Sequence, residues 1–259
     1  MFRTSVFATG TLLLIGALTA VATARGVAVP PYILAAVADK SRPEADTQRD
    51  ADRKPAETLA FAGIKPGEQV AELIPGAGYF TRLLSDVVGP KGKVYALANP
   101  KSPTAPADAP DPAARLAPIT SDPHYANVVV STLSVRVAPI ALPQDVDVVW
   151  TSQNYHDFHN VKELNVVDLD KAVFSALKPG GIYIVLDHAA EAGSGFRDTS
   201  TLHRIDEDAV KQEVESAGFK FVGESGVLRN KADAHTEKVF DGAIRGHTDQ
   251  FILKFQKPK

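Results

Sequence analysis

From residue 67 onward, short apolar runs alternate with amphipathic stretches, and this alternation restricts the fold more than any other feature of the sequence. Two of the longer stretches, 80–87 and 166–177, carry apolar residues at helical spacing. Asp206 is placed to cap a further helix, which Gly218 would end. Alternating strands and helices predict one doubly wound, mostly parallel α/β sheet with ligands at the carboxyl ends of its strands. Seven runs have the length of strands: 69–74, 93–98, 127–130, 147–150, 182–186, 219–222 and 250–255.

The rest of the chain is organised around this sheet. Residues 25–66 are polar and mostly helical in pattern, so we expect an N-terminal helical arm packed against an α/β domain formed by 67–259. Within that domain, residues 100–123 are rich in Pro, Ala and Asp, which predicts an insertion with little core content. The long segment 224–249 has no helical pattern, and such a connection suits antiparallel pairing of the last two strands.

Residues 1–24 have the pattern of a secretory signal peptide. Arg3 precedes an apolar run over 6–21, and the small residues Ala22-Thr23-Ala24 follow it. This pattern predicts export and a periplasmic location, with no stable membrane span after cleavage. The alternative is a retained anchor, because the apolar run approaches the length of about 17 residues that spans a bilayer.

Charge and cysteine content exclude several classes of function. The 28 Lys and Arg against 31 Asp and Glu give a formal net charge of −3, and no basic cluster stands out. A nucleic-acid surface would need such a cluster to neutralise phosphates, so we do not expect a nucleic-acid partner. Because the chain has no cysteine, any metal must be bound by His, Asp or Glu.

An acidic residue in a predicted strand, a Gly-x-Gly turn and a helix start follow one another over residues 70–81. Glu72 lies in the strand, and Gly76 and Gly78 lie in the turn. Glycines let the backbone approach a ligand closely, and the new helix offers free N–H groups and its positive dipole end to a carboxylate. The segment resembles motif I of S-adenosylmethionine-dependent methyltransferases.

Further landmarks extend this resemblance over most of the chain after Ala56. Lys178–Gly181 and Ala217–Phe219 each precede an apolar strand, as in the class I methyltransferase superfamily. The resemblance is closer still to a family of exported, predicted methyltransferases of Gram-negative bacteria. The motifs that carry it are Ser41-Arg42-Pro43, Arg53-Lys54-Pro55, Pro75-Gly76-x-Gly78-Tyr79, Trp150-Thr151-Ser152-Gln153-Asn154-Tyr155-His156-Asp157, Asp187-His188, Leu202-His203-Arg204-Ile205-Asp206 and Thr248-Asp249-Gln250-Phe251.

The resemblance implies a seven-stranded, Rossmann-like fold and S-adenosylmethionine-dependent methyl transfer to a small molecule. Two positions depart from the superfamily pattern. Ile74 stands where the first glycine of motif I usually lies, and Ala98 stands where the second strand usually ends in the acidic residue that holds the ribose hydroxyls. The residues implied to bind the cofactor are Glu72, Pro75, Gly76, Gly78, Tyr79, Thr81, Ser152 and Asn99, the last as a partial substitute for that acidic residue.

Histidines gather after the predicted strands, on the side where this fold places its site. His156 is the first candidate for a general base that removes a proton from the methyl acceptor, with Asp157 as its partner. His188 and His203 are the other catalytic candidates. The leading interpretation needs no metal. Alternatives are a packing role for His156, a metal-assisted enzyme that uses His156, His188 and His203, and a non-catalytic protein that binds an adenosyl ligand.

Overall fold

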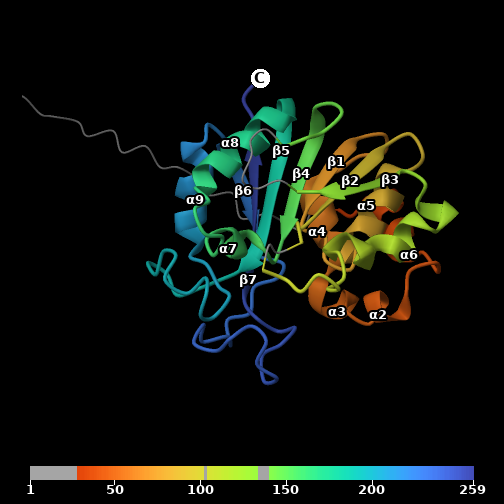
Figure 1. The fold of residues 1–259 in the computed structure, drawn as a ribbon. Coiled ribbons are helices and arrows are strands. Elements are labelled where there is room, and N and C mark those ends of the chain that lie inside the picture. The colour runs from red at the N-terminus through yellow and green to blue at the C-terminus, as the bar shows by residue number, and fades with distance from the viewer. Residues whose placement is uncertain (1–27, 102–103, 134–139) are drawn as a thin grey trace, which may run out of the picture.

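Seven strands form one sheet in the order β3-β2-β1-β4-β5-β7-β6 (Figure 1). The computed structural model describes residues 28–101, 104–133 and 140–259, so the predicted signal peptide, 1–24, lies outside the described residues. The predicted seven-stranded α/β fold is confirmed. The strands are β1 (Gln69–Leu73), β2 (Lys93–Ala98), β3 (Val128–Thr132), β4 (Val146–Ser152), β5 (Leu177–His188), β6 (Lys220–Ser225) and β7 (Gln250–Gln256).

The first five strands are parallel and the last is not. β1 pairs in parallel with β2 and β4, while β2 pairs with β3 and β4 with β5 in the same sense. β7 lies antiparallel between β5 and β6, as predicted from the loop that precedes it. Because β1, β4 and β5 run in one direction, the residues that follow them meet at the same edge of the sheet.

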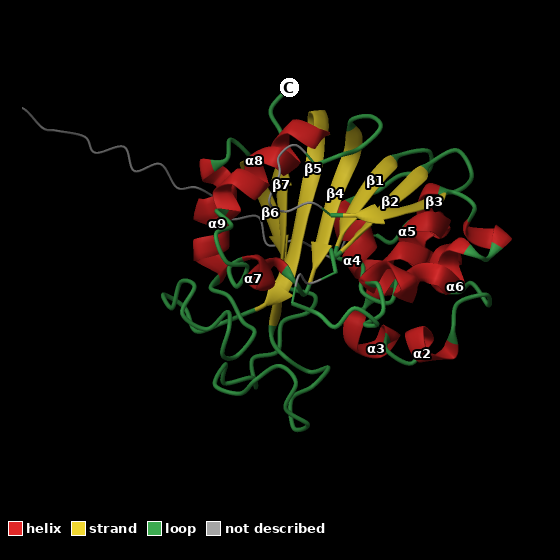
Figure 2. Ribbon diagram, viewed as in Figure 1, coloured by secondary structure: helices red, strands yellow, loops and turns green. Residues whose placement is uncertain are grey.

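Helices cover both faces of the sheet (Figure 2). On one face, α1 packs with both α4 and α5, and the buried residues there include Leu83 and Leu59. On the other face, α8 and α9 contribute Val173 and Val214 to a second buried cluster. The helices are α1 (Pro31–Val37), α2 (Glu44–Thr47), α3 (Asp50–Arg53), α4 (Pro55–Ala62), α5 (Tyr79–Val88), α6 (Ala117–Thr120), α7 (Tyr155–Phe158), α8 (Val166–Ala176) and α9 (Glu207–Ser216), with 3-10 turns η1 (Pro112–Leu116) and η2 (Pro123–Tyr125).

The boundaries of α9 show how the sequence ends and begins its helices. The Asp206 carboxylate accepts the Asp208 N–H, which satisfies one of the free donors of the first turn. Gly218 follows the helix with φ 105°, a conformation that glycine adopts without strain. Both predicted signals are confirmed, and Ile205 and Val210 are fully buried beside the cap.

The arm formed by α1 to α4 is bound to α5 by charged groups. Arg42 donates to both carboxylate oxygens of Asp50, at 2.7 and 2.8 Å, and the Tyr79 hydroxyl donates to the same carboxylate at 2.6 Å. Arg82 of α5 lies 3.0 Å from Asp46 of α2. These contacts place α2 and α3 near the start of α5, below the sheet in Figure 1.

The segment 100–123 differs from its prediction. It was expected to contribute little to the core, but Leu116 of η1 and Ile119 of α6 are fully buried against the α5 side of the sheet. Leu116 and Ile119 are three residues apart, as on one face of a helix, but the prolines and alanines around them hide this pattern in the sequence. β5 is also longer than predicted, because it begins at Leu177 and includes the expected turn 178–181. Among the described residues, no helix is long and apolar enough to cross a membrane.

Candidate functional site

Residues other than glycine adopt left-handed backbone conformations at the carboxyl edge of the sheet. Ile74, directly after β1, has φ 52°, and Gln153, directly after β4, has φ 59°. His203, in the loop that follows β5, has φ 56°. Such conformations cost about 1–3 kcal/mol each and concentrate at functional sites. A β-branched residue such as Ile74 is an outlier there, which makes the β1–α5 turn the most strained of the three.

The turn between β1 and α5 is open at one glycine and closed at the other. A Cβ atom placed on Gly76 would meet nothing within 4 Å, and Pro75 beside it is half-buried. A Cβ atom on Gly78 would lie 2.2 Å from Ile119 Cδ1 and 3.2 Å from Leu116 Cδ2. Gly76 is therefore free for close approach by a ligand, whereas Gly78 is required by packing of the 112–120 segment.

Glu72 is buried in β1 and tied to the start of α5. The Thr81 hydroxyl donates to its carboxylate at 2.6 Å. Burial raises the pKa of Glu72 to about 7, against the lowering effects of Thr81 and the Arg53 guanidinium. The carboxyl group is thus poised between its neutral and charged forms near neutral pH.

The remaining residues that were assigned to the cofactor have different surroundings. Tyr79 is buried beneath the arm, with the Arg53 guanidinium 4.5 Å from its ring centroid, and its hydroxyl is bound by Asp50. Asn99 is exposed after the end of β2, and Ser152 is half-buried at the end of β4. The structure therefore brings Glu72, Thr81 and Ser152 to one edge and uses Tyr79 to hold the arm.

His156 is the most enclosed of the candidate catalytic groups. Its side chain is 3% exposed, and its Nδ1 lies 2.8 Å from Oδ1 of the fully buried Asp187 at the end of β5. Its backbone N–H also donates to Asp187, at 2.7 Å. Burial lowers the pKa of His156, but the carboxylates of Asp187 and Asp157 outweigh that effect and raise it to about 10. In this environment, and without a bound cation, both ring nitrogens of His156 carry a proton at neutral pH.

The other candidate histidines divide into two groups. His203 Nδ1 and Asp157 Oδ1 each lie 3.3 Å from Nε2 of His156. His188 instead lies with its Nδ1 2.7 Å from the Thr248 hydroxyl, and burial lowers its pKa to about 4. In place of the three histidines of the metal alternative, the structure brings together His156, His203 and the Asp157 carboxylate, while His188 faces Thr248.

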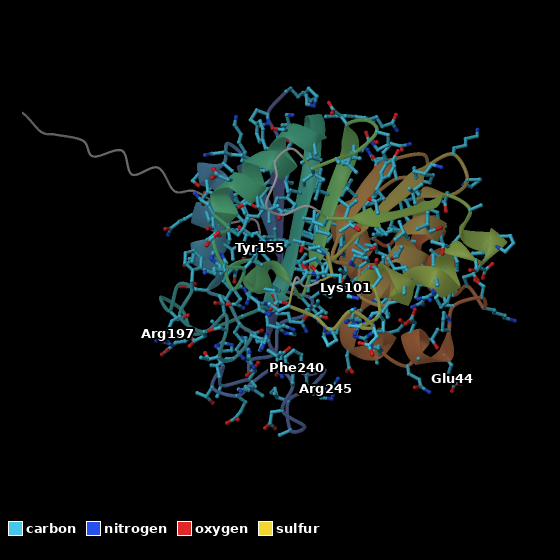
Figure 3. The ribbon with its side chains drawn as sticks, in the orientation of Figure 1. Glu44, Lys101, Tyr155, Arg197, Phe240 and Arg245 are labelled. Atoms are coloured by element: carbon cyan, nitrogen blue, oxygen red, sulfur yellow. The ribbon has the colours of Figure 1, made fainter. Side chains whose placement is uncertain are left out.

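A cavity of about 490 Å³ opens beside these residues. It lies between α3 of the arm and the loop before β7, and Figure 3 shows Phe240 and Arg245 of that loop beyond the carboxyl edge of the sheet. Its cationic lining residues are Arg49, Arg53 and Arg245, of which Arg53 also donates to Gln153 at 2.6 Å. Within the described chain, none of the three has a carboxylate within ion-pair distance. Asp52 also lines the cavity, but the three arginines outnumber it, so the cavity favours an anionic occupant.

This cavity as a whole could not be predicted from the sequence. Arg49 belongs to the arm and Arg245 to the loop before β7, almost 200 residues away. Arg53 had one signal in the sequence, because it begins the Arg53-Lys54-Pro55 motif on which the predicted resemblance partly rests. A charge run in a predicted helix is usually a solvated face, so only the docking of the arm identifies these arginines as cavity residues.

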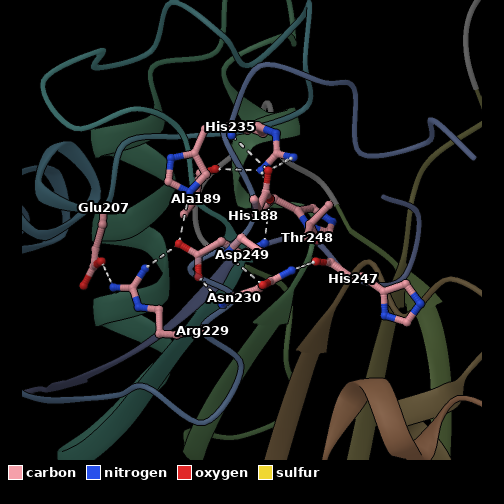
Figure 4. A network of polar contacts seen from close by, with 12 residues as sticks. His188, Ala189, Glu207, Arg229, Asn230, His235, His247, Thr248 and Asp249 are labelled. Atoms are coloured by element: carbon pink, nitrogen blue, oxygen red, sulfur yellow. Dashed lines mark hydrogen bonds and ion pairs between the residues drawn. The ribbon is translucent and has the colours of Figure 1, made fainter. Parts of the chain in front are cut away.

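The wall formed by the 226–249 loop is fixed by buried carboxylates (Figure 4). Asp249 accepts from the Asn230 N–H at 2.7 Å and from His235 Nε2 at 3.1 Å, and Arg229 joins it to Glu207. Nearby, the guanidinium of Arg204, which is fully buried, donates to Asp233 at 2.8 and 3.1 Å. A loop without helix or strand thus has a defined shape on the cavity side.

Comparison with solved structures identifies the fold. A SAM-dependent methyltransferase from Aquifex aeolicus is 17% identical, with a TM-score of 0.56 over 82% of this chain and 95% of that one. A putative sarcosine dimethylglycine methyltransferase from Galdieria sulphuraria is 14% identical, with a TM-score of 0.56 over 83% and 88%. The [4+2]-cyclase SpnF is 16% identical, with a TM-score of 0.59 over 87% and 91%. No protein-family model matches the sequence, and no curated protein matches it significantly. The class I methyltransferase-like fold is confirmed, and at these identities the likeness concerns the fold alone.

Proposed function

We propose that the protein is an S-adenosylmethionine-dependent methyltransferase that acts on a small anionic molecule. The observation that carries the proposal is the β1–α5 turn. Ile74 adopts φ 52°, the conformation that favours glycine, at the position where motif I usually has its first glycine. Gly76 leaves the same turn open to a ligand. The backbone of this turn therefore supports motif I even where the side chain departs from it.

The residues at this edge fit the methionine end of the cofactor better than its ribose. Glu72, Pro75, Gly76 and Ser152 would hold it, and the N–H groups of the first turn of α5 would receive its carboxylate. Ala98 provides no ribose carboxylate, and Asn99 remains the nearest polar side chain in sequence after β2. When bound, S-adenosylmethionine supplies a methyl group on a positively charged sulfonium.

The cavity supports an anionic acceptor. Arg49, Arg53 and Arg245 would bind its charged groups, and the exposed ring of Phe240 would cover its apolar part. Holding the acceptor in line with the methyl group supplies much of the rate of a transfer reaction. The assignment of His156 as general base stays a prediction, and the two carboxylates beside it oppose that role because an imidazolium accepts no proton.

Export to the periplasm is part of the proposal and rests on the pattern of residues 1–24. Expression of the full chain followed by sequencing of the secreted protein tests it. We expect a mature N-terminus at or beside Arg25. A secreted or soluble protein that retains Met1 would contradict the signal peptide.

Calorimetric titration with S-adenosylmethionine and S-adenosylhomocysteine tests the cofactor. We expect saturable binding of both, and its loss in Gly76→Val without a matching loss of thermal stability. Gly193→Val is the matched control, because Gly193 also has a positive φ, 80°, and open space at its Cβ position. Absence of heat with either ligand would refute the proposal. Release of S-adenosylhomocysteine that depends on an added anionic acceptor would then establish transfer.

A further inference from the structure

Three ligand-type atoms face one point outside motif I. They are Nε2 of His156, Nδ1 of His203 and Oδ1 of Asp157. The His156–His203 and His156–Asp157 separations are both 3.3 Å, and the His203–Asp157 separation is 3.6 Å. Two ligands bound at 2.0–2.1 Å to a tetrahedral zinc ion lie about 3.3–3.4 Å apart. The three atoms thus have nearly the spacing of three corners of one coordination tetrahedron.

The histidine at the back of this set is oriented as metal-binding histidines are. Metal-binding imidazoles almost always donate their other N–H to a carboxylate or carbonyl, which fixes the ring and its tautomer. His156 Nδ1 lies 2.8 Å from Asp187 Oδ1, and Asp187 also accepts the backbone N–H groups of His156 and His188 at 2.7 Å. The Asp187 carboxylate is therefore positioned to direct Nε2 of His156 toward a cation.

Charge and access also suit a cation. Within the described residues, neither Asp157 nor Asp187 is paired with a Lys or Arg, so two carboxylates surround the two imidazoles. The His156 side chain is 3% exposed, whereas those of His203 and Asp157 are 31% and 48% exposed. A site with three protein ligands that is closed behind and open in front is typical of catalytic metal centres.

We propose that His156 Nε2, Asp157 Oδ1 and His203 Nδ1 bind one divalent cation of the zinc class. His188 is not a ligand, because it does not belong to this group of atoms that lie within 4.8 Å of one another and its Nδ1 faces Thr248. The open side of the set adjoins the cavity through Phe240, whose ring lies 4.8 Å from that of His203.

A role for the cation in activating the acceptor, unlike its binding, rests on the proposed function. A hydroxyl oxygen of the acceptor that coordinates the cation loses its proton to solvent, because the cation lowers the hydroxyl pKa. That oxygen then forms the O–CH₃ bond while the S–CH₃ bond breaks and its electron pair returns to sulfur. The cation would thus promote loss of the acceptor's proton, the role that the sequence predicts for His156 as a general base.

Titration of the protein with Co²⁺ tests the site. Full-length protein without a histidine tag, treated with chelator, is titrated with Co²⁺ alone and followed by its visible absorption, with Zn²⁺ as competitor. We expect one ion per chain. Losing an outer partner of a metal ligand costs about 10–100-fold in affinity, so His203→Ala and Asp157→Asn should each weaken binding at least about 100-fold. Both side chains are partly exposed, and the variants should remain folded.

Two variants serve as controls that should retain full binding. His188→Gln separates the proposed ligands from the three-histidine alternative, and His124→Ala removes a second group of ligand-type atoms that includes Asp39 and Asp86. Wild-type protein without a Co²⁺ spectrum would mean a hydrogen-bonded set only and would overturn the proposal. Loss of binding in His188→Gln equal to that in His203→Ala would also overturn it. Co²⁺ binding together with no heat from adenosyl ligands would refute the methyltransferase and leave the metal site standing.

Discussion

The side-chain amide of Asn154 donates a hydrogen bond to the carbonyl oxygen of Ile74 at 3.0 Å. The same amide lies 3.3 Å from the Leu73 carbonyl and 3.0 Å from that of Ser152, and the Thr151 hydroxyl donates to the Asn154 side-chain oxygen. One buried side chain thus joins the ends of β1 and β4 and holds Ile74 in its left-handed conformation. The strain of the β1–α5 turn is balanced by contacts made from the neighbouring strand.

At Ile74, the glycine variant should be more stable than the alanine variant, which is the reverse of the usual order in a helix. A left-handed conformation costs a residue with a Cβ about 1–2 kcal/mol, so Ile74→Gly should be more stable than Ile74→Ala by about 1 kcal/mol. Urea unfolding measures the difference. At Lys171, exposed in the middle of α8, the glycine variant should be the less stable one by about 1 kcal/mol. Greater stability of Ile74→Ala would contradict the strained turn.

The two glycines of the turn should respond differently to alanine. Gly78→Ala should lose about 2–4 kcal/mol, because the cost of displacing the buried Ile119 side chain adds to that of a positive φ, whereas Gly76→Ala should lose only about 1 kcal/mol for its positive φ. Denaturant unfolding gives both values. Adding Ile119→Val removes the Cδ1 atom and should restore part of the stability of Gly78→Ala. No restoration would mean that the clash is not the cause.

Burial of Glu72 should make stability depend on pH. Since the pKa rises from about 4.5 in the unfolded chain to about 7 in the folded one, the folded state binds more protons over this interval. The contribution of this group to stability should therefore fall as pH rises from about 4.5 to 7 and stay low above that, a change of about 3 kcal/mol. Glu72→Gln keeps an acceptor for Thr81, so it should remove this dependence and be more stable than the wild type at pH 8. Equal pH slopes in the two proteins would show that Glu72 is charged throughout. If Glu72 also holds the adenosyl ligand, the stabilised variant should bind it more weakly.

Multivalent anions should stabilise the protein through the cavity arginines. Arg49, Arg53 and Arg245 lack carboxylate partners in the described structure, so pyrophosphate or citrate should raise the Tm more than chloride at equal ionic strength. Arg49→Ala and Arg245→Ala should each reduce that rise, while the exposed Arg115→Ala should not. Equal shifts in all three variants would indicate a general salt effect.

The fold could be predicted because its signals are local. Each strand contains a short apolar run that the sequence shows directly, and glycines or a capping residue lie within a few residues of the ends of α5 and α9. The contact of His156 with Asp187 follows from strand pairing. Ser152 pairs with Leu186 in the sheet, and His156 and Asp187 come shortly after these two residues in the chain.

The rest of the site depends on segments whose position in the fold could not be predicted from the sequence. Arg49 and Arg245 come together only when the arm and the loop before β7 dock at the same edge. Leu116 and Ile119 lie among prolines and alanines that hide their spacing, and the conformation of His203 cannot be read from its residue type. Charged and proline-rich segments are exposed on average, but a segment that docks against the rest of the fold can be buried despite its composition.

The position of β7 between β5 and β6 has a consequence for how the chain acquires its structure. β7 is the last of the seven strands to leave the ribosome, yet it pairs on both sides. Until residues 250–256 are made, the long edge of β5 has no partner and β6 has no place in the sheet. The sheet can therefore be completed only after residues 250–256 have been synthesised. A nascent chain stopped before β7 would expose unpaired strand edges to which chaperones can bind.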